Sequence, residues 1–328
     1  AITITLADLR GRDFDDPMWE QFIQQLSVTQ LYDFYRDGGW GNDGIDELGI
    51  PERIDLDGPY GFFAFSVSPD SYRWYQSEPI LAATWNVEMA TLMGESIATE
   101  AWAHRTLEST GNKPLTGWYG PGANLHRSAF GGRNYEYYSE DPVLSGQMAA
   151  YTIRGAASAN MYCYVKHFAL SEMGVNPRRT NVWCNEQALR EIYLRPFEIA
   201  VKDGDANALM SAFNYIGGTW AGGNKALLTD ILRNEWGFRG SVITDWSTGE
   251  DFMLPEQGIR AGNDIWLNPT ARCSNGLDTG DPASLTLGRR AAKNLLYSIC
   301  NTYYAARTYD PEASLAVSEQ GDMFRWWI

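Results

Sequence analysis

The sequence is poor in histidine and cysteine, and basic residues are outnumbered by acidic ones. Its 328 residues include three His and four Cys, and 26 Lys and Arg stand against 41 Asp and Glu, which gives a net charge of −15. The cysteines form no CxxC pair and the histidines lack metal-motif spacing, so we expect no metal and no cofactor. So acidic a chain repels phosphate backbones, and we expect no nucleic-acid partner.

Long apolar stretches, repeats and low-complexity linkers are also absent. No run could span a bilayer, and the length is ordinary for one α/β barrel. We therefore expect a single domain over residues 1–328, with its core at residues 45–305. The aromatic and basic cluster at residues 324–328 fits either an interfacial belt before a membrane segment or the end of a surface strand.

Short apolar runs alternate with helical patterns along the chain. Apolar positions of residues 189–200 recur at i, i+3 and i+4 and predict a helix, which Pro196 should kink or break. A shorter helix is expected at residues 232–236, capped by Thr229 and Asp230 and ended by Gly237, and another at residues 288–303. Six runs are apolar enough to be strands buried on both faces: residues 54–57, 115–119, 161–166, 208–212, 241–245 and 264–267.

Polar reactive side chains follow several of these predicted strands. Asp245 comes at the end of one, beside Trp246, and Lys166 and His167 end another. Barrel enzymes place their chemistry at the carboxyl ends of strands, so this pattern favours an α/β fold of the TIM-type (β/α)8-like barrel, with irregular or missing strands, over a doubly wound sheet.

Each of these side chains has more than one interpretation. A fixed, desolvated carboxylate such as Asp245 is suited to nucleophilic catalysis, but an isolated Asp after a strand commonly caps a turn. Lys166 and His167 together could grip neighbouring hydroxyls, and Lys166 alone could instead form a Schiff base. The 13 Trp and 18 Tyr provide flat faces on which sugar rings can stack.

The segments at residues 120–127 and 132–142, GPGANLHR and GRNYEYYSEDP, closely resemble a signature of glycoside hydrolase family 3. Four further segments resemble that family in the right order, and the resemblance covers about residues 45–270. They are Asp57-Gly58-Pro59, Lys166-His167-Phe168, the run MSAFN at residues 210–214, and Trp236-Gly237-Phe238 leading into Thr244-Asp245-Trp246.

The resemblance implies roles for particular residues. Asp245 would be the catalytic nucleophile, and Trp246 would line the first sugar subsite. The residues that would bind hydroxyls of the sugar are Asp57, Arg133, Lys166 and His167, with Arg178 or its neighbour Arg179 also matching a family arginine and Met210 forming part of the wall. Phe213 stands where the family often has Tyr, so a hydroxyl that would contact the nucleophile is missing.

In this family the acid/base Glu normally lies in a separate α/β sandwich domain, and no such domain follows Asp245 in the sequence. The sequence of residues 183–198 is most similar to family members in which the sandwich domain precedes the barrel. We therefore expect this domain upstream or on a second chain. The resemblance implies a retaining exo-β-glycosidase of the β-glucosidase or β-xylosidase type, acting on β-linked oligosaccharides or aryl glycosides. A non-catalytic sugar-binding subunit and a Schiff-base lyase or aldolase using Lys166 are the alternatives.

Overall fold

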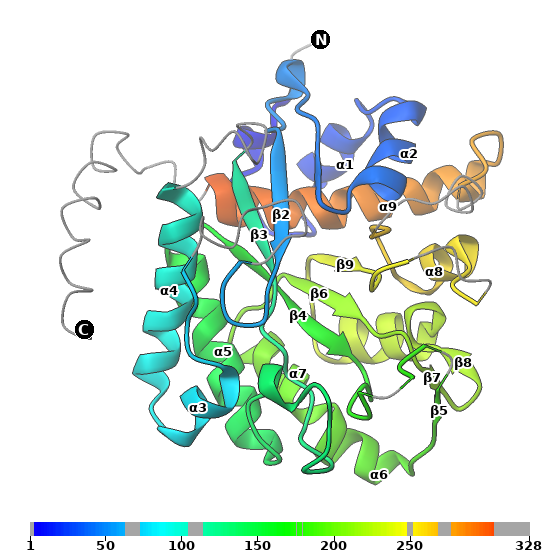
Figure 1. Ribbon diagram of the computed structural model, residues 1–328. Coiled ribbons are helices and arrows are strands. Elements are labelled where there is room, and N and C mark those ends of the chain that lie inside the picture. Colours follow the sequence, from blue (N-terminus) through cyan, green and yellow to red (C-terminus); the bar gives the residue numbers. More distant parts are fainter. Residues whose placement is uncertain are drawn as a thin grey trace.

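A computed structural model shows a curled sheet flanked by helices (Figure 1). It describes residues 3–62, 73–103, 114–174, 176–178, 180–247, 252–267 and 277–304. The order of the main sheet is β1-β2-β3-β4-β6-β9. Its strands are β1 (Gly41–Asn42), β2 (Arg53–Asp57), β3 (Leu115–Tyr119), β4 (Tyr162–Phe168), β6 (Ala208–Ser211) and β9 (Ser241–Ile243).

Five of the six predicted strands are present and run parallel to one another. The prediction of a strand at residues 264–267 was wrong, because only a single parallel bridge joins Ile265 to Ile243 there. Asp245 was placed inside a strand but lies two residues beyond the end of β9. The two-residue β1, which was not predicted, runs antiparallel to β2. The fold is therefore a TIM-type barrel with missing and irregular strands.

Helices cover both sides of the sheet. Figure 1 shows α4, α5 and α7 along one side, whereas α1, α2 and α9, from opposite ends of the sequence, lie together on the other. A small second sheet holds β5 (Asn181–Val182), β7 (Tyr215–Ile216) and β8 (Thr219–Trp220). The α-helices are α1 (Pro17–Ile23), α2 (Val28–Asp37), α3 (Glu78–Ala83), α4 (Val87–Ala103), α5 (Pro142–Ser158), α6 (Glu186–Ala188), α7 (Arg195–Lys202), α8 (Pro255–Ala261) and α9 (Pro282–Ile299).

The predicted helix at residues 189–200 is broken, as expected. A π-helical segment Leu189–Tyr193 precedes α7, which begins with Pro196 in its first turn, where its missing N–H costs nothing. The predicted cap at Thr229 and Asp230 was wrong, because a π-helical segment Ala226–Glu235 already begins upstream. Gly237, at φ 75°, follows the end of that segment, as the sequence indicated. The last predicted helix starts six residues earlier, at Pro282.

Helix α5 begins at a strong cap. Asp141 Oδ1 accepts hydrogen bonds from the N–H groups of Val143 (2.8 Å) and Leu144 (2.7 Å), and Pro142 follows in the first turn. Asp141→Ala should therefore lower the free energy of unfolding by about 1 kcal/mol. Urea unfolding followed by circular dichroism measures this change. Asp141→Ser, which keeps a capping oxygen, should retain most of the stability, and equal losses in both variants would contradict the capping role.

Side chains alternate between the two faces of β2. Leu56 points to the apolar layer under α4 and α5, whereas Arg53 and Asp55 point into the barrel and are fully buried. The Arg53 guanidinium donates to Asp55, which also accepts hydrogen bonds from the hydroxyls of Tyr162 (2.8 Å) and Tyr164 (3.3 Å). A buried ion pair with its remaining lone pairs satisfied is the arrangement that offsets the cost of desolvation. This network fills the barrel interior beneath the end of β2.

The sheet does not close strand to strand within the described residues. Residues 38–40 lie instead between β1 and residues 265–267, and a Cβ on Gly39 would lie 2.5 Å from the carbonyl oxygen of Trp266. The backbone N–H of Trp40 donates to the Tyr119 hydroxyl (2.8 Å), and the Trp40 carbonyl accepts from Asp55 N–H (3.0 Å). A loop held by these bonds thus completes the wall of the barrel.

Within the described part of the chain, no helix combines the length and the apolar character needed to cross a bilayer. Residues 324–328, for which a membrane-interface belt was one interpretation, lie outside the described residues.

Candidate active site

Polar side chains from three parallel strands meet at one end of the barrel. Asp57 is the last residue of β2, Lys166 and His167 lie near the end of β4, and Asp245 follows β9. Lys166 Nζ donates to Asp57 Oδ1 at 2.7 Å, and His167 Nε2 lies 4.0 Å from Asp245 Oδ2. The acid after β9 and the basic pair of β4 therefore face the same site.

Asp245 is buried, with 8% of its surface exposed. Its Oδ1 accepts a hydrogen bond from the backbone N–H of Trp246 at 2.7 Å, whereas Oδ2 has no hydrogen-bond partner among the described residues. Burial raises the pKa of Asp245 to about 6, against the opposing effects of Arg133, the Trp246 N–H and Lys166. A carboxylate oxygen that is fixed in direction and free of hydrogen bonds is available to attack an electrophile.

This pKa leads to a pH dependence. Any reaction that uses Asp245 as a nucleophile requires the ionised form, so its rate constant should fall about tenfold per pH unit below a midpoint near pH 6. Stopped-flow or inactivation rates measured between pH 4 and pH 8 would show this acid limb. A midpoint near 4 would contradict the desolvation of Asp245.

That measurement needs a control for Glu172, because burial raises the pKa of its carboxyl to about 7 and its titration could also produce an acid limb. Asn124 Nδ2 donates to Glu172 Oε1 (3.2 Å), and Asn124 also bonds both backbone groups of His167. Glu172 thus lies in a layer behind His167. In Glu172→Gln the midpoint should stay near 6 if Asp245 causes the acid limb.

The hydrogen bonds of His167 determine its protonation. Arg133 Nη2 lies 2.8 Å from His167 Nε2, and since a guanidinium only donates, Nε2 must accept. Nδ1 then carries the proton and donates to the Tyr137 hydroxyl (3.3 Å), which donates in turn to the Ser171 carbonyl (3.3 Å). Burial, followed by the charges of Arg133 and Lys166, lowers the pKa of His167 well below its usual value. His167 is therefore neutral.

Lys166 is held as a cation. Burial alone would lower the pKa of Lys166, but Asp57 and Glu136 outweigh it and raise that pKa above its usual value. Glu136 Oε2 lies 3.9 Å from Lys166 Nζ, and Glu136 Oε1 accepts from Arg133 Nε. The site therefore presents two fixed cations, Lys166 and Arg133, next to the Asp245 carboxyl. The side chain of Asp57 is 46% exposed and open to a ligand.

The indole ring of Trp246, the residue after Asp245, packs against a second indole ring. Trp246 is half-buried and makes an edge contact with Trp40, whose ring centre is 5.5 Å away. Trp40 also contacts the ring of Tyr119 at 5.2 Å and has a positive φ of 66°, which is unusual for a bulky residue. The bonded loop at residues 38–40 thus supports Trp246 from behind.

The other predicted site residues contact apolar side chains. Met210 is buried in the apolar cluster of the barrel interior. Arg178 is exposed, and its guanidinium carbon lies 5.2 Å from the ring centre of Phe213. Phe213 packs in an apolar cluster that Trp246 also touches. Arg179, the alternative to Arg178, lies outside the described residues.

Sequence reasoning missed Glu136, Tyr137 and Trp40. Glu136 could have been found, because it follows Arg133 by three residues in a segment already singled out, and that spacing places two side chains on one face of a helical turn. Nothing in the local pattern pointed to Trp40, since its contact with Trp246 joins residues more than 200 positions apart.

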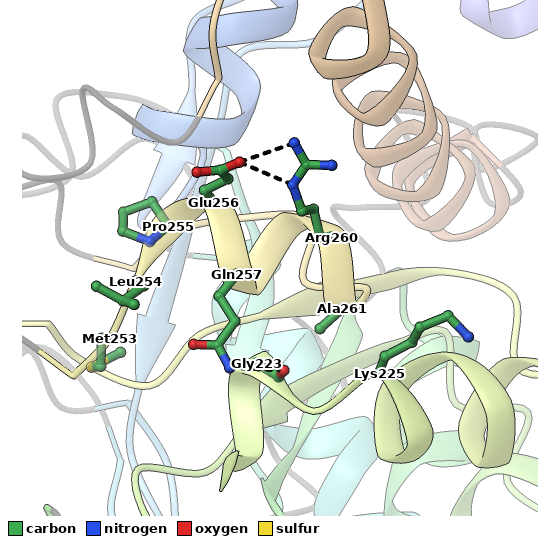
Figure 2. Close-up of a pocket in the computed structure, with 9 residues that line it drawn as sticks. All are labelled: Gly223, Lys225, Met253, Leu254, Pro255, Glu256, Gln257, Arg260 and Ala261. Atoms are coloured by element: carbon green, nitrogen blue, oxygen red, sulfur yellow. Dashed lines mark hydrogen bonds and ion pairs between the residues drawn. The ribbon is translucent and has the colours of Figure 1, made fainter.

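A cavity of about 680 Å³ lies elsewhere, beside α8, and contains none of these residues (Figure 2). Glu256 and Arg260 form an exposed ion pair at its rim. Among the described residues, no group of three or more His, Cys, Asp and Glu side chains could hold a metal ion.

Comparison with known proteins matches the chain to one family of enzymes. Residues 73–280 match the family described as "Glycosyl hydrolase family 3 N terminal domain". The chain is 34% identical over 289 residues to a β-glucosidase of Ruminococcus albus, and 36% identical over 259 residues to β-glucosidase A of Butyrivibrio fibrisolvens. These alignments cover 83% and 75% of this chain but only 29% of each relative, so the chain spans less than a third of their length.

A solved structure is similar over nearly the whole chain. β-Glucosidase 3B of Thermotoga neapolitana, in complex with α-D-glucose, superimposes with a TM-score of 0.74 at 27% identity. The match covers 93% of this chain and 46% of that protein.

Proposed function

Because this chain belongs to glycoside hydrolase family 3, we propose that it is the barrel part of a retaining exo-β-glucosidase, in which Asp245 is the nucleophile. The observation that carries the proposal is the position of Asp245: its unbonded Oδ2 lies 4.0 Å from neutral His167, beside two fixed cations. The enzymes named above are β-glucosidases, and one of them binds glucose.

The proposed reaction takes place in two steps. Asp245 Oδ2 attacks the anomeric carbon as the bond to the leaving oxygen breaks, which gives a glycosyl ester. Water then attacks that carbon, gives up a proton to the group that protonated the leaving oxygen, and releases the sugar and the Asp245 carboxylate. Lys166, Arg133 and Asp57 would bind ring hydroxyls, and contacts that strengthen in the oxocarbenium-like transition state would lower the barrier.

The leaving oxygen needs a proton. A retaining enzyme holds its two carboxyl groups about 5–5.5 Å apart, and we propose that the second is a Glu on an α/β sandwich domain of the same protein or of a second chain. The single barrel domain described above would then be one of two catalytic parts. The substrates would be β-linked oligosaccharides or aryl glycosides.

The geometry disfavours the Schiff-base alternative. A Schiff-base lysine must be neutral to attack a carbonyl, whereas Asp57 and Glu136 hold Lys166 in its charged form. Borohydride with a carbonyl substrate should therefore trap no adduct on Lys166.

The decisive test is covalent labelling. Incubation with 2,4-dinitrophenyl 2-deoxy-2-fluoro-β-glucoside, whose leaving group needs no acid assistance, should add one fluoroglucosyl group to Asp245. Mass spectrometry of the digested protein would locate it. Sugar binding without labelling would support the alternative of a non-catalytic sugar-binding subunit, and a label on another residue would overturn the assignment of Asp245.

A further inference from the structure

We propose that Glu136 is a positioning residue of this site: it holds Arg133 and Lys166 in place and limits the positive potential that they exert on Asp245. The inference rests on the proposed function, because it concerns how the glycosyl-transfer site is tuned. Glu136 itself would touch neither the sugar nor the reacting atoms.

The contacts of Glu136 join both cations. Its side chain is 3% exposed, and its Oε1 accepts from Arg133 Nε while Oε2 faces Lys166 Nζ at 3.9 Å. The same Arg133 guanidinium reaches His167 Nε2 through Nη2 at 2.8 Å. One carboxylate thus anchors the arginine that fixes the histidine next to Asp245.

Local structure places Glu136 in this position. Asn134–Glu136 form a 3₁₀ turn, in which side chains three residues apart lie nearly above one another, so Glu136 is held on the side of Arg133. Gly122 lets this turn approach closely, because a Cβ there would overlap the Glu136 carbonyl oxygen. The Gly120-Pro121-Gly122 loop and the turn therefore act as one unit that presents Glu136 to β4.

The charges around Glu136 determine what its removal does. Tyr135 and Tyr137 face it but are neutral, since burial raises the pKa of both hydroxyls. Glu78, from α3, is also close, and burial raises its pKa well above the usual value, which favours its neutral form. Among the described residues, Glu136 and Asp57 are then the carboxyl groups besides Asp245 that face Lys166 and Arg133. Without Glu136, the two cations would stabilise the ionised form of Asp245 more strongly.

Glu136→Gln should therefore change two readouts. The acid limb of inactivation by the 2-fluoro glucoside should move by roughly half to one pH unit to lower pH, because the uncompensated cations lower the pKa of Asp245. The concentration of inactivator at half-maximal rate should rise about tenfold, because Arg133 loses its anchor. A side chain that only supports the fold would move neither the acid limb nor this concentration in the folded fraction.

Two further variants separate charge from geometry. Glu136→Asp keeps the charge but shortens the reach, so its limb should stay at the wild-type position while its half-saturating concentration rises; this variant also tests the proposal if Glu136→Gln fails to fold. Glu140→Gln, an exposed carboxylate four residues on, should leave both readouts unchanged. The proposal would be overturned if Glu136→Gln kept both the wild-type acid limb and the wild-type inactivator concentration at half-maximal rate. A shifted acid limb in Glu136→Asp would also overturn it. A wild-type protein that is not labelled at all would instead reject the proposed function.

Discussion

Replacing Asp245 with alanine should abolish formation of the glycosyl-enzyme and slow turnover of an activated glucoside on the order of 10⁴-fold, which corresponds to about 5.4 kcal/mol of barrier. Binding of glucose should remain measurable by titration calorimetry, because Asp57, Arg133 and Lys166, the side chains proposed to bind its hydroxyls, are still present. Burst kinetics with 2,4-dinitrophenyl β-glucoside would measure the rate. The matched control is Glu256→Ala at the cavity of Figure 2, which should react as the wild type does.

External azide should restore part of the lost rate in Asp245→Ala. The cavity left by the missing carboxylate admits a small anion, which can attack the anomeric carbon from the same side while dinitrophenolate leaves. The product would be the α-glycosyl azide, whose configuration nuclear magnetic resonance determines. Unchanged turnover in Asp245→Ala without azide would show that another group is the nucleophile.

The second large effect concerns stability. Asp55→Asn should lower the free energy of unfolding by about 3–5 kcal/mol, because it removes the charge that balances a fully buried Arg53 and leaves an uncompensated cation inside the barrel. Urea denaturation, with fluorescence of the buried indoles as the probe, gives the midpoint and slope from which this change is calculated.

An exposed ion pair provides the comparison. Asp230→Asn breaks the contact with Lys225 at the surface and should cost less than about 1 kcal/mol. A double replacement of Arg53 and Asp55 by apolar residues of similar volume should recover most of the loss, since the penalty arises from the unpaired charge. If Asp55→Asn were as mild as Asp230→Asn, the buried pair would not contribute as described.

The strands and the site at their ends were predictable for one physical reason. Strands buried on both faces form continuous apolar runs, and parallel strands all present their carboxyl ends to the same side of a barrel. Polar residues at the ends of such runs, as His167 and Asp245 are, could therefore be expected to meet, and their side chains do face one site.

The remaining features depend on contacts that a linear pattern does not encode. β1 is only two residues long, too short for any periodicity, and Ile265 makes a single bridge where a full strand was expected. The burial of Arg53 and Asp55 could not be predicted from the sequence, because charged residues inside a barrel contradict the rule that cores are apolar. Their burial becomes understandable only when Tyr162 and Tyr164 are seen to satisfy them.

The wall formed by residues 38–40 has a consequence for thermal motion. A ladder between strands consists of many cooperative amide bonds, whereas this wall depends on a few separate ones, including that from Trp40 N–H to the Tyr119 hydroxyl. Brief openings should therefore begin along this line, and deuterium should enter the amide of Trp40 before those in the middle of β4. Since Trp40 supports Trp246, these openings would occur next to the carboxylate proposed as the nucleophile, and under the proposed function their rate would govern how readily a leaving sugar escapes.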